Sequence, residues 1–127
     1  MQYKNILLID DDDGSHELFL SAVAEISDSA NCVALSNAAE ALEKLATKNI
    51  IPDIIFVDLN MPVMNGLQFL KEIKKNDSLK DIPVIIFSTS SHATTISLAK
   101  EFGAMDFITK PARYNELLEI LSPFVSV

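Results

Sequence analysis

The chain has 127 residues, 49% of them hydrophobic, which suits a single domain with a real hydrophobic core and excludes a disordered chain. Ten Lys and Arg residues stand against 18 Asp and Glu residues, so the net charge is −8, and an acidic surface disfavours direct nucleic-acid binding. No apolar run approaches the ~18 residues of a membrane span, the amino end lacks a signal-peptide core, and the single Cys32 excludes an internal disulfide, which together predict a cytoplasmic protein without membrane attachment.

Short apolar runs alternate with segments of helical spacing along the whole chain. The predicted elements are a strand at Ile6–Ile9, a helix at Ser15–Ser27, a strand at Cys32–Ser36, a helix capped by Asn37 that frays near Lys48, a strand at Asp53–Asp58, a helix from Leu67 to about Asn76, a strand at Val84–Ser88, a loop and cap at Thr89–Ser91, a helix from Ala93 that Gly103 stops, a strand at Asp106–Thr109, and a helix from Tyr114 that Pro123 ends near Leu121. Five alternations of strand and helix with short connections predict one α/β domain over residues 1–127, a doubly wound parallel sheet between two layers of helices.

Polar side chains follow four of the predicted strands. Asp10 and Asp11 follow the first strand, and Asp58 ends the third. Ser88 ends the fourth strand, and Lys110 follows the fifth. Ligands of open α/β sheets bind in the crevice at the carboxyl ends of the strands, so we expect these side chains to converge there.

Three carboxylates at one crevice repel one another, and a divalent cation relieves that repulsion. Mg²⁺ prefers oxygen ligands in an octahedron and usually keeps several waters. The carboxylates of Asp11 and Asp58, the carbonyl of a loop residue such as Asn60, and waters would suit it. Asp10 could act through a bound water.

The same crevice suits phosphoryl chemistry. An aspartate such as Asp58 can act as nucleophile and form an acyl phosphate. Phosphoryl transfer needs mainly positioning and charge neutralisation, which the Lys110 ammonium and the Ser88 hydroxyl can help to supply. With no residue ready as general base, the sequence predicts self-phosphorylation from an activated donor and slow hydrolysis.

Four motifs in this order resemble the response-regulator receiver domain, the phosphoacceptor module of two-component signalling, in a stand-alone form like the chemotaxis response regulator. They are the acidic pair Asp10-Asp11 after Ile6–Ile9, Val57-Asp58-Leu59-Asn60-Met61-Pro62 with Gly66, Ser88 after Pro83–Phe87, and Lys110-Pro111 after Gly103-Ala104. The resemblance covers essentially the whole chain. It implies a flavodoxin-like (βα)5 three-layer sandwich with strand order 2-1-3-4-5.

The resemblance also implies a role for each site residue. These roles are phosphoacceptor for Asp58; Mg²⁺ ligands for Asp10, Asp11, Asp58 and the backbone carbonyl of Asn60; phosphoryl contacts for Ser88 and Lys110; switch residues for Ser88 and Phe107; tuning of the phosphoryl lifetime for Asn60 and Ser90; and a cis peptide bond before Pro111.

The implied partners are a sensor histidine kinase or a phosphotransfer protein, and a downstream protein that binds the face of the fourth helix, fifth strand and fifth helix. Two features depart from the family. Ala112 stands where many relatives carry an aromatic residue, and Asn115–Val127 contains no Lys or Arg. The second feature disfavours a charge-paired dimer, so we expect a monomer or weak homodimer without an effector domain.

Two other functions compete with this hypothesis. A phosphatase with an aspartate nucleophile, of the haloacid-dehalogenase kind, needs a second Asp two residues later as general acid, and Asn60 occupies that place. A degenerate receiver that only binds partners would lack one of the site residues, yet all are present. His16 and His92 are expected at the surface, and Cys32 is expected to be a buried small apolar residue.

Overall fold

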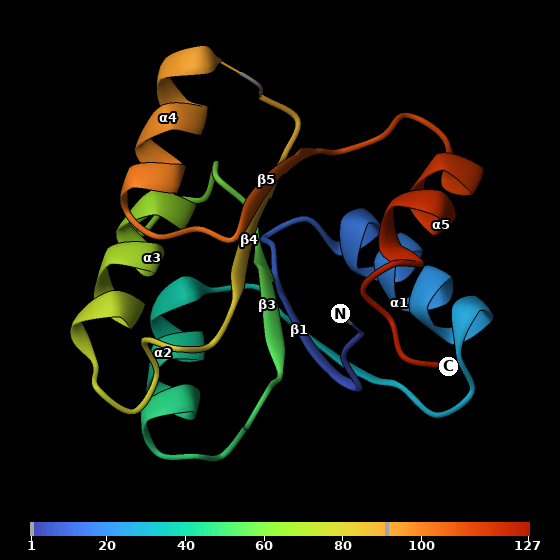
Figure 1. The fold of residues 1–127 in the computed structure, drawn as a ribbon, viewed down its shortest axis with the longest axis horizontal. Coiled ribbons are helices and arrows are strands. Elements are labelled where there is room, and N and C mark those ends of the chain that lie inside the picture. The colour runs from blue at the N-terminus through green and yellow to red at the C-terminus, as the bar shows by residue number, and fades with distance from the viewer. Residues whose placement is uncertain (1, 91) are drawn as a thin grey trace.

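The apolar runs form parallel strands, and the segments with helical spacing form the helices between them (Figure 1). The computed structural model describes residues 2–90 and 92–127. The strands are β1 (Asn5–Ile9), β2 (Asn31–Leu35), β3 (Ile54–Val57), β4 (Val84–Ser88) and β5 (Asp106–Thr109). The helices are α1 (Asp13–Ile26), α2 (Ala38–Ala46), α3 (Gly66–Lys75), α4 (Ala93–Glu101) and α5 (Tyr114–Leu121). The predicted alternation is therefore confirmed.

All neighbouring strands run parallel, in the order β2-β1-β3-β4-β5. This confirms both the doubly wound sheet and the strand order implied by the resemblance. In Figure 1, α1 and α5 lie on one side of the sheet, and α2, α3 and α4 lie on the other. Because helices cover both faces, the central strands β1, β3 and β4 are nearly continuous apolar runs instead of alternating between apolar and polar residues.

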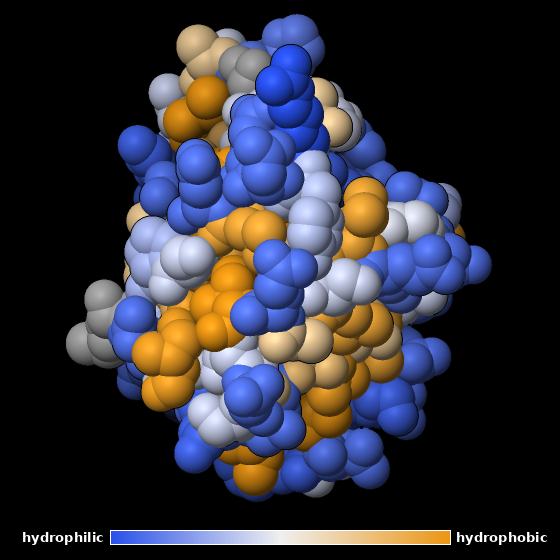
Figure 2. Space-filling model, turned by 90° about the vertical axis from the view of Figure 1, so that its right-hand side faces the viewer, coloured by the Kyte–Doolittle hydropathy of each residue, from blue (hydrophilic) through white to orange (hydrophobic). Residues whose placement is uncertain are grey.

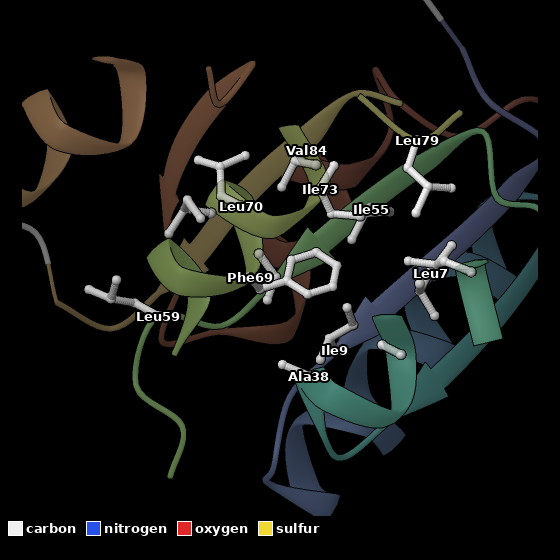
Figure 3. Packing of buried hydrophobic residues seen from close by; sticks show 14 of the residues in the cluster. Leu7, Ile9, Ala38, Ile55, Leu59, Phe69, Leu70, Ile73, Leu79 and Val84 are labelled. Atoms are coloured by element: carbon white, nitrogen blue, oxygen red, sulfur yellow. The ribbon is translucent and has the colours of Figure 1, made fainter. Parts of the chain in front are cut away.

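Strand β3 shows how one strand serves two hydrophobic cores. Ile55 and Val57 belong to the cluster shared with α2, α3 and α4, whereas Ile54 and Phe56 belong to the cluster shared with α1 and α5. Figure 3 shows the first cluster, in which Phe69 of α3 packs over the strands. Successive side chains of a strand point to opposite faces, so a strand buried on both faces needs consecutive apolar residues. Such a strand is suited to the middle of the sheet, where β3 lies, and the Asp that follows β3 therefore lies there as well.

Side-chain caps set the starts of the helices. The Asp12 carboxylate accepts a hydrogen bond from the N–H of Gly14 and caps α1, which therefore begins at Asp13, two residues before the predicted Ser15. Asn37 caps α2 as predicted, through a bond from the N–H of Glu40.

The other boundaries differ from prediction by little. β2 begins one residue before the predicted Cys32, which is only partly buried. Gly103 has a φ of 100°, the left-handed conformation expected of a residue that stops α4. α5 ends at Leu121, as predicted. The predicted loop and cap at Thr89–Ser91 extends to Ser91, which lies outside the described residues.

The predicted cis bond before Pro111 is wrong, because the Lys110–Pro111 peptide is trans in the structure. A bond to proline favours trans by roughly 0.5–1 kcal/mol. The register of β5 against β4 sets the direction of the Lys110 side chain instead. The N–H of Lys110 donates to the carbonyl of Ser88 at 2.7 Å, while its ammonium reaches Asp10. The turn therefore needs no cis bond to bring the ammonium to the acids.

The two ends of the described chain meet at the amino end of the sheet. Tyr3 forms a parallel bridge with Val125, its N–H donates to the carbonyl of Phe124, and its carbonyl accepts from the N–H of Ser126. Figure 1 shows both termini in this region. Within residues 2–90 and 92–127, none of the helices has the length and apolar character that a bilayer crossing requires.

Candidate functional site

The site begins with the adjacency of β1 and β3. Ile9, the last residue of β1, pairs with Val57, the last residue of β3, and the N–H of Asp58 donates to the carbonyl of Ile9 at 2.9 Å. The residues that follow both strands therefore lie side by side. Carboxylate oxygens of Asp10, Asp11 and Asp58 lie within 4.8 Å of one another, which confirms the predicted convergence of the acids.

Asp10 is the most deeply buried of the three acids. It has an exposed fraction of 0%, and each of its carboxylate oxygens accepts a hydrogen bond. Oδ1 accepts from the N–H of Asp12 at 3.0 Å, and Oδ2 accepts from the ammonium of Lys110 at 2.6 Å. A buried charge is tolerated only when it is paired and hydrogen-bonded, and these two bonds meet that condition.

Lys110 brings a positive charge to the three carboxylates. Its Nζ lies 2.6 Å from Asp10 Oδ2 and 3.7 Å from Asp58 Oδ1. It also donates to the hydroxyl of Ser15 on α1 at 3.5 Å. Two negative charges remain when one ammonium faces three carboxylates, so the oxygens form a ready site for a divalent cation.

The electrostatics of Asp58 reflect this excess of negative charge. Burial raises the pKa of its carboxyl above the ordinary 3.8, and the charges of Asp10 and Asp11 raise it further. The Lys110 ammonium and the N–H of Asn60 act in the opposite direction on this pKa, and the net shift is upward. An added cation would favour the ionised carboxylate.

Ser88 and Asn60 are held by the loop that follows β4. The hydroxyl of Ser88 is fully buried and accepts from the N–H of Ser90 at 3.2 Å. The side-chain amide of Asn60 donates to the hydroxyl of Ser90 at 3.2 Å. Ser90 therefore ties the loop after β3, which contains Asn60, to the loop after β4.

Phe107 lies apart from the acids. It is partly buried on β5 and packs against the cluster shared with α2, α3 and α4. It is paired in register with Ile86, two residues before Ser88 on the neighbouring strand. The predicted switch residues therefore sit on adjacent strands, with the aromatic ring on the α4 side of the sheet.

A pocket lies beside Lys110, between the first turns of α1 and α5. Its lining includes Leu18, Phe19, Phe87, Ala112, Tyr114 and Leu117. The small side chain of Ala112, which replaces the aromatic residue of many relatives, is exposed at this pocket. Figure 2 views this side of the molecule and shows apolar patches among hydrophilic residues.

Gly66 is needed for the backbone geometry of the site. The sequence alone does not show why a glycine is required at this position. Its N–H donates to the carbonyl of Leu59 at 3.1 Å. A Cβ at this position would lie 2.6 Å from the carbonyl oxygen of Asp58 and 3.1 Å from Cα of Leu59. The first residue of α3 thus lies directly against the backbone of Asp58, and only glycine permits this approach.

His16 is a site residue that the sequence analysis missed. Its ring Nε2 lies 2.5 Å from the carbonyl oxygen of Asp10, and the side chain is partly buried instead of lying free at the surface as expected. The sequence offers no signal for this contact, because six residues separate the partners and the helix that brings them together begins between them. Its neighbour Ser15 donates to the carboxylate of Asp12, and this bond is the main reason why the pKa of Asp12 falls below its ordinary value.

Comparison with known proteins agrees with this geometry. The family model for the response regulator receiver domain matches residues 6–122. The DNA-binding transcriptional regulator NtrC of Escherichia coli (strain K12) is 32% identical over 126 residues, which is 99% of this chain and 26% of NtrC. The chain therefore spans about a quarter of that relative.

Solved structures with the same fold include the phosphorylated cyanobacterial phytochrome response regulator RcpA. It is 30% identical with a TM-score of 0.87, over 95% of this chain and 90% of that one. The Mn²⁺-bound form of response regulator Rcp1 is 25% identical with a TM-score of 0.81, over 94% and 90% of the two chains.

We predict that Gly66→Ala will destabilise the protein, because the added Cβ would meet backbone atoms of Asp58 and Leu59 that cannot yield. Overpacking of this kind costs about 1–3 kcal/mol in the free energy of unfolding, measured by urea denaturation. Gly14→Ala is the matched control, since a Cβ there would meet only the Asp12 carboxylate at 3.6 Å. It should leave stability unchanged or raise it by up to about 1 kcal/mol. Equal effects of the two substitutions would contradict the argument.

We also predict that Asp58→Asn will raise the free energy of unfolding near pH 7 when no divalent cation is present. The folded pKa of Asp58 lies above 3.8, so wild-type stability falls as pH rises from about that value through the folded pKa. The variant lacks this fall, so its advantage should grow over that window and then stay level. Urea denaturation of both proteins at a series of pH values measures this difference in the free energy of unfolding.

Asp28→Asn removes the same charge from an exposed position, and its effect should stay within about 0.5 kcal/mol. Added Mg²⁺ should reduce the advantage of Asp58→Asn, because the ion stabilises the form that binds it. A variant less stable than wild type without metal would show that repulsion at Asp58 is not the governing force.

Proposed function

This chain belongs to the response regulator receiver family of two-component signalling, and we propose that Asp58 is its phosphoacceptor. The observation that carries the proposal is the convergence of three carboxylates within 4.8 Å, with the Lys110 ammonium 3.7 Å from Asp58. A receiver domain accepts a phosphoryl group as a signal and is not a turnover enzyme. The proposed donor is the phosphohistidine of a sensor histidine kinase or a phosphotransfer protein.

The proposed cofactor is Mg²⁺, held by Asp10, Asp11, Asp58 and the backbone carbonyl of Asn60. The donor set fits the ion, because hard cations prefer oxygen ligands and the three acids supply them at one edge of the sheet. When bound, Mg²⁺ would supply positive charge that neutralises phosphoryl oxygens. The presence of Mn²⁺ in the related Rcp1 structure supports a divalent ion here.

The proposed reaction needs little more than alignment. An oxygen of the Asp58 carboxylate attacks phosphorus, a P–O bond forms, and the P–N bond to the donor imidazole breaks with its electron pair leaving on nitrogen. Lys110 would turn from Asp10 toward the phosphoryl oxygens, a small change because it already lies near Asp58.

The proposed switch couples Ser88 to Phe107. The Ser88 hydroxyl would donate a hydrogen bond to a phosphoryl oxygen, and its movement toward that oxygen would weaken the bond that it now accepts from the N–H of Ser90. That movement would change the loop after β4 and allow Phe107, half-buried beside α4, to move inward. The face of α4, β5 and α5 would then present a different surface to a downstream protein target, with the domain acting as a monomer or weak homodimer.

We predict that wild-type protein treated with Mg²⁺ and a small phosphodonor will gain one phosphoryl group, and that Asp58→Asn will gain none. Intact-mass spectrometry measures the adduct. Lys110→Ala should slow the reaction on the order of a hundredfold, since it removes a preorganised cation from the site of developing charge. Asp77→Asn, which changes an exposed acid at the end of α3, is the matched control and should react like wild type. An undiminished adduct in Asp58→Asn would assign the phosphoacceptor elsewhere.

Asn60 and Ser90 are proposed to tune the lifetime of the phosphoryl group, because their hydrogen bond spans the two loops next to Asp58. Asn60→Ala and Ser90→Ala should each change the decay rate several-fold, while stability changes by about 0.5–1.5 kcal/mol, the usual worth of one hydrogen bond. Their effects on decay should be non-additive in the double variant. Ser78→Ala removes a comparable hydroxyl–asparagine bond far from the site and should leave decay unaltered. Unchanged decay in both single variants would refute this role.

A further inference from the structure

A histidine of α1 reaches back to the acidic loop. His16 lies in α1, and its ring Nε2 contacts the carbonyl oxygen of Asp10, six residues earlier. A carbonyl oxygen can only accept a hydrogen bond, so Nε2 must carry the hydrogen in this contact. The ring therefore acts as a donor that joins the helix to the loop after β1.

With this contact, every polar group of Asp10 is engaged by a different part of the chain. Its N–H donates to the carbonyl of Leu35 at the end of β2 at 3.0 Å. Its carboxylate accepts from the N–H of Asp12 and from the ammonium of Lys110. The carbonyl is the remaining group, and His16 holds it.

Holding this carbonyl has a consequence for the next residue. The carbonyl of Asp10 and the N–H of Asp11 belong to one planar peptide unit. Fixing the carbonyl direction therefore fixes the plane from which the backbone of Asp11 continues. Asp11 is exposed, in contrast to Asp10, so fewer neighbours pack around it to hold its carboxylate in place.

We propose that His16 is a positioning residue for the acidic pair, and that its Nε2–H on the carbonyl of Asp10 sets the affinity for the divalent cation by orienting Asp11. This inference rests on the cation site proposed above. In other proteins, replacing a group that hydrogen-bonds to a metal ligand and orients it typically lowers the affinity for the metal 10- to 100-fold. The contact adds no ligand, so its effect comes from the geometry of the ligands alone.

The test compares His16→Leu with His16→Gln. Leucine fills a similar volume without a donor, whereas the side-chain amide of glutamine can place an N–H at about the reach of Nε2. Binding is measured with Mn²⁺, whose free concentration is read by electron paramagnetic resonance, and with Mg²⁺ in competition. We expect His16→Leu to weaken binding of both ions on the order of tenfold. His16→Gln should stay within about threefold of wild type, since it restores the donor.

His92→Leu is the matched control, because His92 is an exposed histidine at the start of α4 with no side-chain capping bond. It should bind the ions like wild type. Urea denaturation without metal is followed in parallel. If His16→Leu is partly unfolded under the binding conditions, His16→Phe, which keeps a ring without a donor, takes its place.

Wild-type affinity in His16→Leu would overturn the inference and leave the cation site intact. Equal weakening in His16→Leu and His16→Gln would also overturn it, because the hydrogen bond would then not be the cause. Weakening of similar size in His92→Leu would do the same. A wild-type protein that binds neither ion would remove the proposed cation site itself, and this inference with it.

Discussion

Mutual repulsion among Asp10, Asp11 and Asp58 is the constraint around which the rest of the structure is arranged. Their oxygens lie within 4.8 Å of one another, and the ammonium of Lys110 offsets only part of their charge. Such an arrangement costs stability, so the rest of the fold must hold the acids in place against their repulsion. The parallel pairing of β1 with β3 provides that support, because backbone hydrogen bonds fix two of the acids at neighbouring strand ends.

The backbone around the acids is held as closely as the side chains. Gly66 allows α3 to begin against the carbonyl of Asp58, and Lys110 is fixed by its own N–H to Ser88 as well as by its ammonium. These contacts join α3 to the carboxyl ends of β1, β3, β4 and β5, so the site is complete only when these elements are in place. A strained cluster on a rigid frame is a common compromise at functional sites, where local stability is given up for chemistry.

The sequence was sufficient to predict the fold and to predict which acidic residues lie together at the site. Continuous apolar runs identify buried parallel strands, and the residue after each run must lie at the same edge of the sheet. Contacts that depend on three-dimensional detail were out of reach. The Lys110–Pro111 bond was expected to be cis from family resemblance, yet it is trans, and the contact between His16 and Asp10 depends on where α1 begins. The bond from Asn60 to Ser90 joins residues 30 positions apart, and no local pattern encodes it.

The bridge between Tyr3 and Val125 places the two ends of the described chain on the same side of the domain. Both ends of the described chain are anchored at the amino edge of the sheet, a strand's length of roughly 17 Å from the acids at the opposite edge. A polypeptide fused to either end would leave the domain on the side opposite the acids. Attachment at either end is therefore compatible with a partner approaching the end of the sheet that carries the acids.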